Sequence, residues 1–398
     1  MDINQLKNVA TEYGTPTFAF DCDEVRGRAA SIKEIMNDGL HNNTIKLCYS
    51  IKANPFLIKP LLDTVDYLEV CSPGELQICI HSNVPGDKII YSGVHKELCD
   101  ITEAISYGAY IITAESVRHY ELILEAVKNT GKSVRVLPRL SSKSQFGMSY
   151  EDIELILDKN KNNEMVDIIG LHYFVGTQRT KLKHQQKELT MLRETVESLR
   201  EKYRIPLEWL EYGPGLAYPY FEGDDFSDTL RPMKELKAEL DILTEFCKPT
   251  IEMGRFLASS CGYYLTGVSD TKRSYDNNWV IVDGGINHVN YLGSMMGLKV
   301  PVISVIKSDN NVNADMVSEH TICGSLCTTN DVLVRSYSCE ELRIGDILVF
   351  HNIGAYSITE GLNLFLSRTM PKVVLVEKSA TILARDAKET YLINSGLI

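Results

Sequence analysis

Residues 46–55 read Lys-Leu-Cys-Tyr-Ser-Ile-Lys-Ala-Asn-Pro, an apolar run that ends on Lys52 and is stopped by Asn54-Pro55. A short apolar segment bounded by turn-forming residues is typical of a buried β-strand. From this segment onward the chain alternates such strands with amphipathic helices, which is the pattern of parallel βα units. Eight strands are expected, at 45–50, 66–71, 88–92, 110–113, 133–138, 166–172, 207–212 and 250–252. The sequence therefore predicts an α/β fold, a closed (β/α)8 barrel of the TIM type.

The helices expected between these strands carry apolar residues on one face, at spacings of three and four. One stripe consists of Leu182, Leu189, Leu192, Val196 and Leu199, and a second of Leu230, Met233, Leu236, Leu240 and Leu243. Both stripes indicate helices that pack against a core.

After residue 260 the chain changes to strands without regular helices between them, at 263–268, 279–283, 300–305, 332–337, 347–350 and 372–376. This pattern is typical of a mostly antiparallel C-terminal β domain. The strand at 17–21 precedes the barrel and is expected to join that domain. We therefore predict a barrel over residues 24–260 and a β domain built from 1–23 and 261–398.

The composition indicates a globular protein whose ligand is small. The 398 residues carry a formal net charge of −12 with both signs interspersed, which argues against nucleic acid or an anionic membrane as the main partner. The ten cysteines form no CxxC pair, so reduced thiols are expected, and no metal site is expected. The N-terminus lacks a basic stretch followed by an apolar one, and no apolar run reaches membrane-spanning length. A cytoplasmic protein is therefore expected.

Polar residues gather where the barrel strands end, which is where such barrels build their active sites. Lys52 follows the first strand, His172 ends the sixth, residues 213–215 (Gly-Pro-Gly) follow the seventh, and residues 252–255 (Glu-Met-Gly-Arg) close the eighth. A partly desolvated lysine amine can lose its proton and form a Schiff base with the aldehyde of pyridoxal phosphate. Taken alone, Lys52 is more simply interpreted as a lysine at the point where the chain leaves the core.

The chain resembles the fold-type III pyridoxal-phosphate decarboxylases, the group of diaminopimelate, ornithine and arginine decarboxylases. The resemblance covers almost the whole length and implies an alanine racemase-like fold and an amino-acid decarboxylase. Its motifs, in the family's order, are Tyr49-Ser50-Ile51-Lys52-Ala53-Asn54, residues 170–178 (Gly-Leu-His-Tyr-Phe-Val-Gly-Thr-Gln), Gly213-Pro214-Gly215, Glu252-Met253-Gly254-Arg255, Gly324-Ser325-Leu326-Cys327, and Gly345-Asp346 leading to Gly354-Ala355-Tyr356.

The resemblance implies that Lys52 holds the cofactor as a Schiff base, that His172 stacks on the cofactor face, and that Glu252 pairs with the pyridine nitrogen. A carboxylate at that nitrogen keeps the ring protonated, and therefore able to accept electrons. Without the resemblance, His172 would be a core histidine and Glu252 a member of a structural ion pair.

The resemblance also assigns the phosphate to Gly213, Gly215, Gly254 and Arg255. Glycines bring backbone N–H groups close to a phosphate, and Arg255 adds charge there or meets a substrate carboxylate. The family usually has a third glycine where Pro214 stands, so one N–H donor is missing. By itself, Gly-Pro-Gly is more often a simple turn.

In the C-terminal part, the resemblance makes Cys327 the acid that returns a proton after carbon dioxide leaves. The family delivers this thiol across a dimer interface, together with a tyrosine that matches Tyr356. The resemblance therefore implies a homodimer with shared active sites. Read alone, Cys327 is a buried, inert thiol, although its place in Gly-x-Leu-Cys with Asp331 four residues on favours the functional interpretation.

The departures from the family pattern fall on substrate recognition, for which we name Arg255, Thr328, Tyr291 and Asp331. Thr328 stands where the diaminopimelate enzymes have an acidic residue and the ornithine enzymes an aspartate, and no arginine follows the turn at 283–285 (Asp-Gly-Gly) until Arg335. The pattern looks more like that of relatives acting on modified or carrier-protein-tethered amino acids. The substrate is thus a diaminopimelate-, ornithine- or lysine-like amino acid or a modified one.

Two other functions remain open. An amino-acid racemase would share the barrel, the β domain and Lys52, but racemases lack the Gly-x-Leu-Cys segment. A non-catalytic regulator that binds pyridoxal phosphate is the second, but such proteins tend to lose the lysine or the cysteine, and both Lys52 and Cys327 are present.

Overall fold

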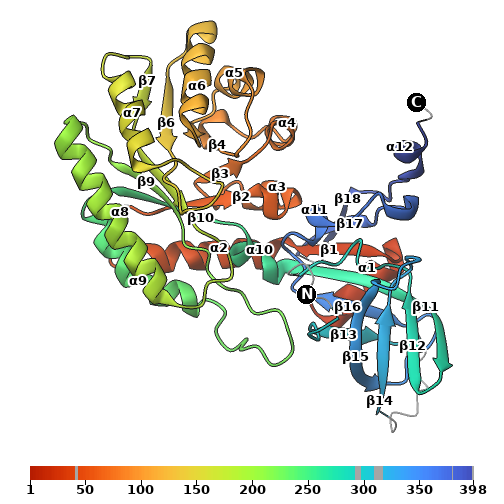
Figure 1. Ribbon diagram of the computed structural model, residues 1–398. Helices are drawn as coiled ribbons and strands as arrows, with labels where there is room; N and C mark the ends of the chain where they lie inside the picture. The colour runs from red at the N-terminus through yellow and green to blue at the C-terminus, as the bar shows by residue number, and fades with distance from the viewer. Residues whose placement is uncertain (41–43, 292–296, 309–316, 379, 397–398) are drawn as a thin grey trace. The chain divides into compact units, whose positions relative to one another are not determined.

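The computed structural model describes residues 1–40, 44–291, 297–308, 317–378 and 380–396. The chain divides into two compact units (Figure 1). The barrel unit consists of Arg26–Tyr218 and Asp228–Leu257, and the β unit of Met1–Val25, Pro219–Ser227 and Ala258–Ile398. The segment Pro219–Ser227 lies inside the range expected for the barrel, yet it groups with the β unit because Phe221 pairs with Pro301.

The barrel unit contains one parallel sheet in the order β7-β6-β5-β4-β3-β2-β10-β9-β8. Its strands are β2 Lys46–Ser50, β3 Tyr67–Val70, β4 Ile89–Tyr91, β5 Ile111–Ala114, β6 Val134–Pro138, β7 Val166–Ile168, β8 Gly170–Phe174, β9 Trp209–Gly213 and β10 Lys248–Met253. Only Ile169 separates β7 from β8, and these two strands pair with β6 and β9 respectively. The predicted barrel is confirmed as nearly closed, with its sixth strand divided in two.

The helices of this unit follow the strands, as βα units require. They are α3 Ile58–Leu61, α4 Pro73–His81, α5 Leu98–Tyr107, α6 Val117–Thr130, α7 Tyr150–Asn160, α8 Leu182–Tyr203, α9 Arg231–Thr244 and α10 Arg255–Ala258, while α2 Cys22–Asn37 leads in from the β unit. The predicted stripes of α8 and α9 are buried, except for Leu182 and Leu230 at the helix starts. The side chains of Ser72, Ser116 and Ser149 cap α4, α6 and α7 by accepting a backbone N–H, which satisfies otherwise unpaired donors.

Aromatic rings close one end of the strand barrel. Tyr67 begins β3, Trp209 begins β9 and Tyr110 directly precedes β5. The centroids of the Tyr67 and Tyr110 rings lie 5.3 Å apart, and those of Tyr67 and Trp209 5.7 Å apart. Because all three residues stand at N-terminal strand ends, the polar residues at the C-terminal ends are left facing the other way.

The β unit is a mixed, mostly antiparallel sheet in the order β15-β14-β12-β11-β1-β17-β18, with β16 pairing β11 and β13. Its strands are β1 Thr17–Asp21, β11 Gly262–Ser274, β12 Asn277–Val282, β13 Ile303–Ile306, β14 Val317–Cys323, β15 Val332–Glu340, β16 Ile347–His351, β17 Lys372–Glu377 and β18 Ala380–Arg385. The predicted β domain is confirmed, and β1 joins it by pairing with β11 and β17. The sequence analysis missed β14 and β18.

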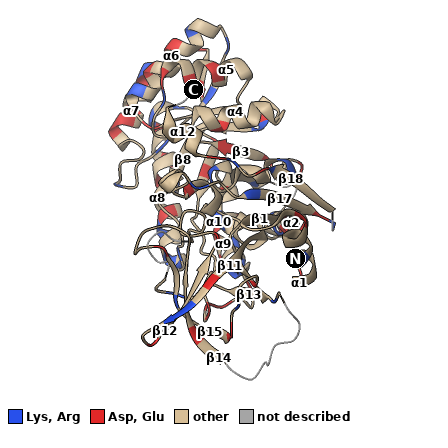
Figure 2. Ribbon diagram, turned by 90° about the vertical axis from the view of Figure 1, so that its right-hand side faces the viewer, with Lys and Arg blue, Asp and Glu red and all other residues tan. Residues whose placement is uncertain are grey.

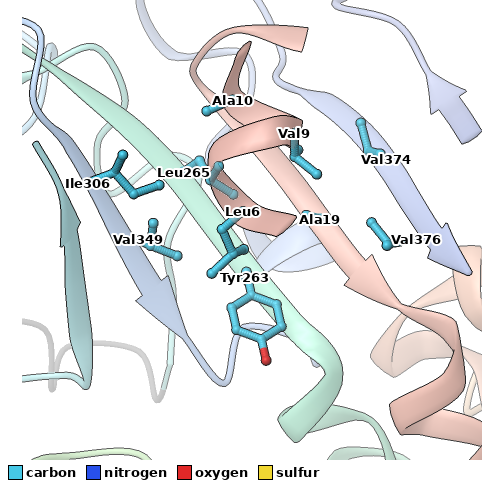
Figure 3. Close-up of a cluster of buried hydrophobic side chains, with 10 residues drawn as sticks. All are labelled: Leu6, Val9, Ala10, Ala19, Tyr263, Leu265, Ile306, Val349, Val374 and Val376. Carbon is cyan, nitrogen blue, oxygen red and sulfur yellow. The ribbon is translucent and has the colours of Figure 1, made fainter. Parts of the chain in front are cut away.

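The core of the β unit forms under its first helix, α1 Ile3–Tyr13, which Asp2 and Gln5 start with a capping box. Figure 3 shows the apolar residues of this helix against the neighbouring strands. The cluster consists of Leu6, Val9, Ala10, Ala19, Tyr263, Leu265, Ile306, Val349, Val374 and Val376. Two short helices, α11 Ser357–Glu360 and α12 Tyr391–Ser395, complete the unit.

Acidic and basic residues are interspersed along the helices and strands in Figure 2, in keeping with the mixed charge of the sequence. Within the described ranges, no helix is both long and apolar enough to cross a membrane.

Candidate active site

Lys52 stands directly after β2, in the short helix η1 Ile51–Ala53. The turn that follows is fixed by the side chain of Asn54, which accepts a hydrogen bond from the Phe56 N–H at 3.1 Å. Lys52 Nζ lies 2.9 Å from Glu69 Oε2 and 3.4 Å from Glu252 Oε1. The lysine side chain is 34% exposed, whereas the two carboxylates are 3% and 4% exposed. The amine therefore remains reachable while its counter-charges are buried.

Glu252 is the centre of this group. Its Oε1 accepts a hydrogen bond from Ser50 Oγ at 2.8 Å, and its Oε2 lies 3.2 Å from His172 Nε2. Burial alone would raise the pKa of Glu252, but Lys52 and His172 outweigh burial and hold it well below the usual range. An ionised carboxylate thus sits in the barrel interior, stabilised by the groups around it.

The loop after β9 presents backbone at the strand ends. Gly215 has φ +62°, and a Cβ there would lie 1.8 Å from Gly176 O, so only glycine fits. Gly213 ends β9. Arg255 begins α10 directly after Gly254; it is 9% exposed, and its Nε lies 3.3 Å from Thr177 Oγ1. The glycine loop and the arginine are therefore both packed against the segment after β8.

A second buried ion pair lies at the ends of β5 and β6. Arg139 Nη1 donates to Glu115 Oε1 at 2.7 Å, and the Gly147 N–H donates to Glu115 Oε2 at 2.9 Å. Burial would raise the pKa of Glu115, but Arg139 and the Gly147 N–H outweigh burial and lower it. The Arg139 guanidinium also lies 6.0 Å from the centre of the Phe174 ring, and Lys52 Nζ lies 5.9 Å from the same ring.

We expect Glu115→Gln to lower the free energy of unfolding by about 3 kcal/mol at neutral pH, because it leaves Arg139 buried without its counter-charge. A carboxyl group with a lowered folded pKa stabilises above its unfolded pKa and loses that contribution as the pH falls through the folded value. The difference from the parent should therefore shrink below pH 4.5, the ordinary pKa of glutamate. Urea titrations across pH measure this. The exposed pair of Lys159 and Glu121 is the control, and Glu121→Gln should change nothing measurable.

In the β unit, Asp331 organises the turn that carries Cys327. Its buried carboxylate accepts the backbone N–H groups of Ile286 at 2.8 Å and Leu326 at 2.7 Å. Burial raises the pKa of Asp331 despite these two hydrogen bonds, which lower it. Cys327 is exposed and Thr328 partly buried. Asp331 thus fixes the backbone of the turn, while the thiol faces outward from the chain.

The two tyrosines named from the sequence have different surroundings in the β unit. Tyr291 is 2% exposed, its hydroxyl donates to His351 O at 2.7 Å, and its ring contacts those of Tyr220 and Phe221. Tyr356 precedes α11 with φ +68°, and its carbonyl accepts two backbone N–H groups. Backbone strain of this kind persists where the surrounding structure enforces it.

Within each unit, then, the expected residues fall into groups. Lys52, His172 and Glu252 meet at the barrel strand ends, with the glycine loop after the neighbouring strand β9 and Arg255 just after β10. Cys327, Thr328 and Asp331 share one turn of the β unit. The roles of all these residues remain predictions.

The sequence analysis missed two carboxylates of the barrel interior. Glu69 in β3 is the nearest carboxylate partner of Lys52, and Glu211 in β9 is fully buried. The signal was available in each case, because an acidic residue within an otherwise apolar, fully buried strand needs a reason to be there.

Comparisons with known proteins identify the family of this chain. The family model "Pyridoxal-dependent decarboxylase, pyridoxal binding domain" matches residues 23–259. The chain belongs to this family. It is a pyridoxal-phosphate-dependent amino-acid decarboxylase, and the matched range contains the whole Lys52, His172 and Glu252 group.

Relatives extend the likeness over nearly the full length of this decarboxylase. It is 27% identical to L-glutamyl-[BtrI acyl-carrier protein] decarboxylase of Niallia circulans, with 94% of this chain and 92% of the relative covered. It is 24% identical to diaminopimelate decarboxylase of Aquifex aeolicus, over 98% and 94%. The crystal structure of diaminopimelate decarboxylase from M. jannaschii has the same fold, with a TM-score of 0.87 at 24% identity over 98% of this chain and 94% of that one.

The barrel residues of this decarboxylase fit pyridoxal phosphate. A reachable amine stands beside an ionised interior carboxylate. The loop at Gly215 offers backbone where any Cβ would collide. Among the described residues, the buried His172 Nδ1 has no hydrogen-bond partner.

Proposed function

We propose that this decarboxylase acts on an amino acid whose side chain ends in an uncharged, covalently modified group, with carrier-linked glutamate as the leading candidate. Lys52 Nζ provides the amine for covalent attachment of the cofactor aldehyde, and Cys327 of a second copy of the chain returns the proton. The observation that carries the catalytic assignment is the reachable Lys52 amine between the buried carboxylates of Glu69 and Glu252.

Each residue has a separate task in this mechanism. When bound, the cofactor supplies the electron sink that accepts the bonding pair left by carbon dioxide. Glu252, ionised and fixed by Ser50 and His172, holds a proton on the ring nitrogen. His172 would pack against the face of the bound ring. Backbone N–H groups of the Gly213–Gly215 loop, together with Arg255, bind the phosphate.

Protonation completes the reaction. The exposed thiol of Cys327 gives its proton to the carbon that lost the carboxylate, and solvent restores the thiol. Because Asp331 accepts the N–H of Leu326 within this turn and the N–H of Ile286 in a neighbouring segment, the thiol is carried on a rigid support. We propose a homodimer in which each site uses Lys52 of one chain and Cys327 of the other, as the family resemblance implies.

The substrate assignment is supported by the segment after the Asp283-Gly284-Gly285 turn, where related enzymes that bind a distal carboxylate place an arginine. Here Asn287 and His288 are 1% and 3% exposed. His288 Nδ1 lies 2.8 Å from the Tyr264 hydroxyl, and His288 Nε2 lies 3.0 Å from Asn287 Nδ2. Burial, with smaller effects of Arg385 and Arg368, lowers the pKa of His288 to about 3. The segment therefore contributes no cation at neutral pH.

Thr328 adds to the same argument. It stands next to Cys327, and it provides a hydroxyl where a substrate ammonium group would need a carboxylate. A substrate end that is neither anionic nor cationic is consistent with both positions, and the carrier-linked substrate of the Niallia circulans relative is of this kind.

Product mass spectrometry tests the proposal. The purified protein with pyridoxal phosphate is incubated separately with lysine, ornithine, arginine, diaminopimelate and carrier-linked glutamate. We expect loss of carbon dioxide from carrier-linked glutamate alone. Turnover of a free diamino acid would contradict the substrate class but leave the decarboxylase intact, and free glutamate is the matched control for the carrier.

A further inference from the structure

The barrel interior contains a carboxyl group that the mechanism does not use. Glu211 lies in the middle of β9 and is 0% exposed. Apart from the Cys48 thiol, which is only a weak donor, its oxygens have no hydrogen-bond partner among the described residues. An ionised carboxylate in such a place would cost several kcal/mol unless it were paired.

The strand register places Glu211 among other ionisable groups. It pairs with His172 of β8 and with Thr250 of β10, so its side chain is on the same face of the sheet as both. Glu252 follows Thr250 on that face, two residues along β10. The titratable groups that face Glu211 are Cys48 of β2, Glu69 of β3, Lys52 of η1, His172 of β8 and Glu252 of β10.

The three carboxyl groups are not equivalent. Glu69 and Glu252 contact Lys52 directly, and Glu252 also contacts His172. Within the part of the chain that the structure describes, Glu211 has no such ion pair, and the neighbouring Cys48 thiol is only a weak donor. Burial first, then Glu252 and Glu69, raise the pKa of Glu211 well above the ordinary value, whereas the pKa of Glu252 is lowered. When the pKa values of two neighbouring carboxyl groups shift in opposite directions, the group with the raised pKa is the protonated acid and the other is the anion.

We infer that Glu211 carries a proton in the folded protein and acts as a positioning residue that leaves Glu252 the ionised carboxylate beside Lys52. A second charge at Glu211 would repel that of Glu252 and favour protonation of Glu252 instead. The protonation of Glu211 can be tested on the apoprotein alone. Its effect on cofactor binding rests on the proposed function of Glu252.

Infrared difference spectroscopy on the apoprotein tests the protonation directly. We expect a carbonyl stretch of a protonated carboxylic acid at pH 7 that shifts in deuterated water and disappears in Glu211→Gln. Glu69→Gln, which alters a carboxylate paired with Lys52, should retain that band and is the matched control. A parent spectrum identical to that of Glu211→Gln in this region would overturn the inference.

Unfolding equilibria give a second, independent readout. A group protonated in the folded state and ionised in the unfolded state makes the unfolding constant rise by about tenfold per pH unit above the unfolded pKa. Trp209 lies in the barrel and Trp279 in the β unit, and they are the two tryptophans of the chain. In a Trp279→Phe background, Trp209 fluorescence therefore reports on the barrel alone.

We expect the unfolding constant of this background to rise by about tenfold per pH unit between pH 6 and 8 relative to the same protein with Glu211→Gln. A merely structural Glu211 would give parallel curves, which would overturn the inference. If Glu211→Gln does not fold, Glu211→Met gives the same comparison. Neither readout involves a substrate, so failure of the proposed decarboxylation leaves this test unaffected.

Discussion

Lys52→Ala is expected to lose all measurable decarboxylation, the largest effect of any single substitution in this protein. The side chain is the reachable amine of the site and lies within 3.4 Å of the carboxylates of Glu69 and Glu252. Its loss removes the covalent attachment and also leaves these two carboxylates without their shared cation. Carbon dioxide release, measured with carrier-linked glutamate, gives the activity. Borohydride reduction followed by peptide mass spectrometry gives the site of attachment.

Lys46→Ala is the matched control for this experiment. Lys46 occupies the other end of the same strand and pairs with Asp66, so its removal should leave both activity and attachment intact. Activity retained in Lys52→Ala, or cofactor mass found on a different lysine after reduction, would show that the assignment of Lys52 is wrong.

Cys327→Ala should lower kcat by about 10²–10⁴-fold, the usual contribution of a positioned general acid. Mixing the Cys327→Ala and Lys52→Ala chains gives a more decisive test of whether the two residues act across a dimer. Lys52→Ala chains are expected to be inactive and Cys327→Ala chains nearly so, but a mixed dimer would have one site with both the lysine and the thiol. Activity should therefore reappear when the two variants exchange subunits.

Native mass spectrometry has to establish that mixed dimers form. Cys99→Ala, which removes an exposed thiol in the barrel unit, is the control and should keep full activity. When it is mixed with Lys52→Ala, the activity should be no higher than that of the parent chain mixed with Lys52→Ala. If mixed dimers form and stay inactive, Cys327 does not serve the neighbouring chain. If the Cys327→Ala variant by itself kept full activity, Cys327 would not be the proton donor.

The meeting of Lys52, His172 and Glu252 could be predicted from the sequence because strand ends in a parallel barrel converge by topology. The structure adds their separations, 3.4 Å from Lys52 and 3.2 Å from His172 to Glu252. The family motifs then gave the chemistry. The spacing of the motifs thus predicted that these residues lie near one another, but it predicted no particular contact between them.

Glu69 and Glu211 could not be assigned in this way. A strand of a parallel barrel is buried on both faces, so its hydrophobic pattern does not say which side chains point inward. The face follows from the register, for example the pairing of Glu211 with Thr250, which depends on the whole barrel. A charged residue in such a strand therefore indicates a functional or structural site, but the sequence does not show which residue it contacts.

The two missed strands have a different cause. Four of the six residues in Ala380–Arg385 are exposed, and the strand is held by backbone pairing with β17. Val317–Cys323 contains four polar residues in succession, Ser318, Glu319, His320 and Thr321. Neither segment shows the apolar alternation that predicts a strand, because backbone hydrogen bonds leave no trace in composition.

The rings of Tyr67, Tyr110 and Trp209 pack together at the N-terminal strand ends, as side chains fill the interior of barrels of this kind. Lys52 stands at the opposite ends of the strands. Substrate and amine product would therefore both bind at the Lys52 end. We expect inhibition by the amine product to be competitive with substrate.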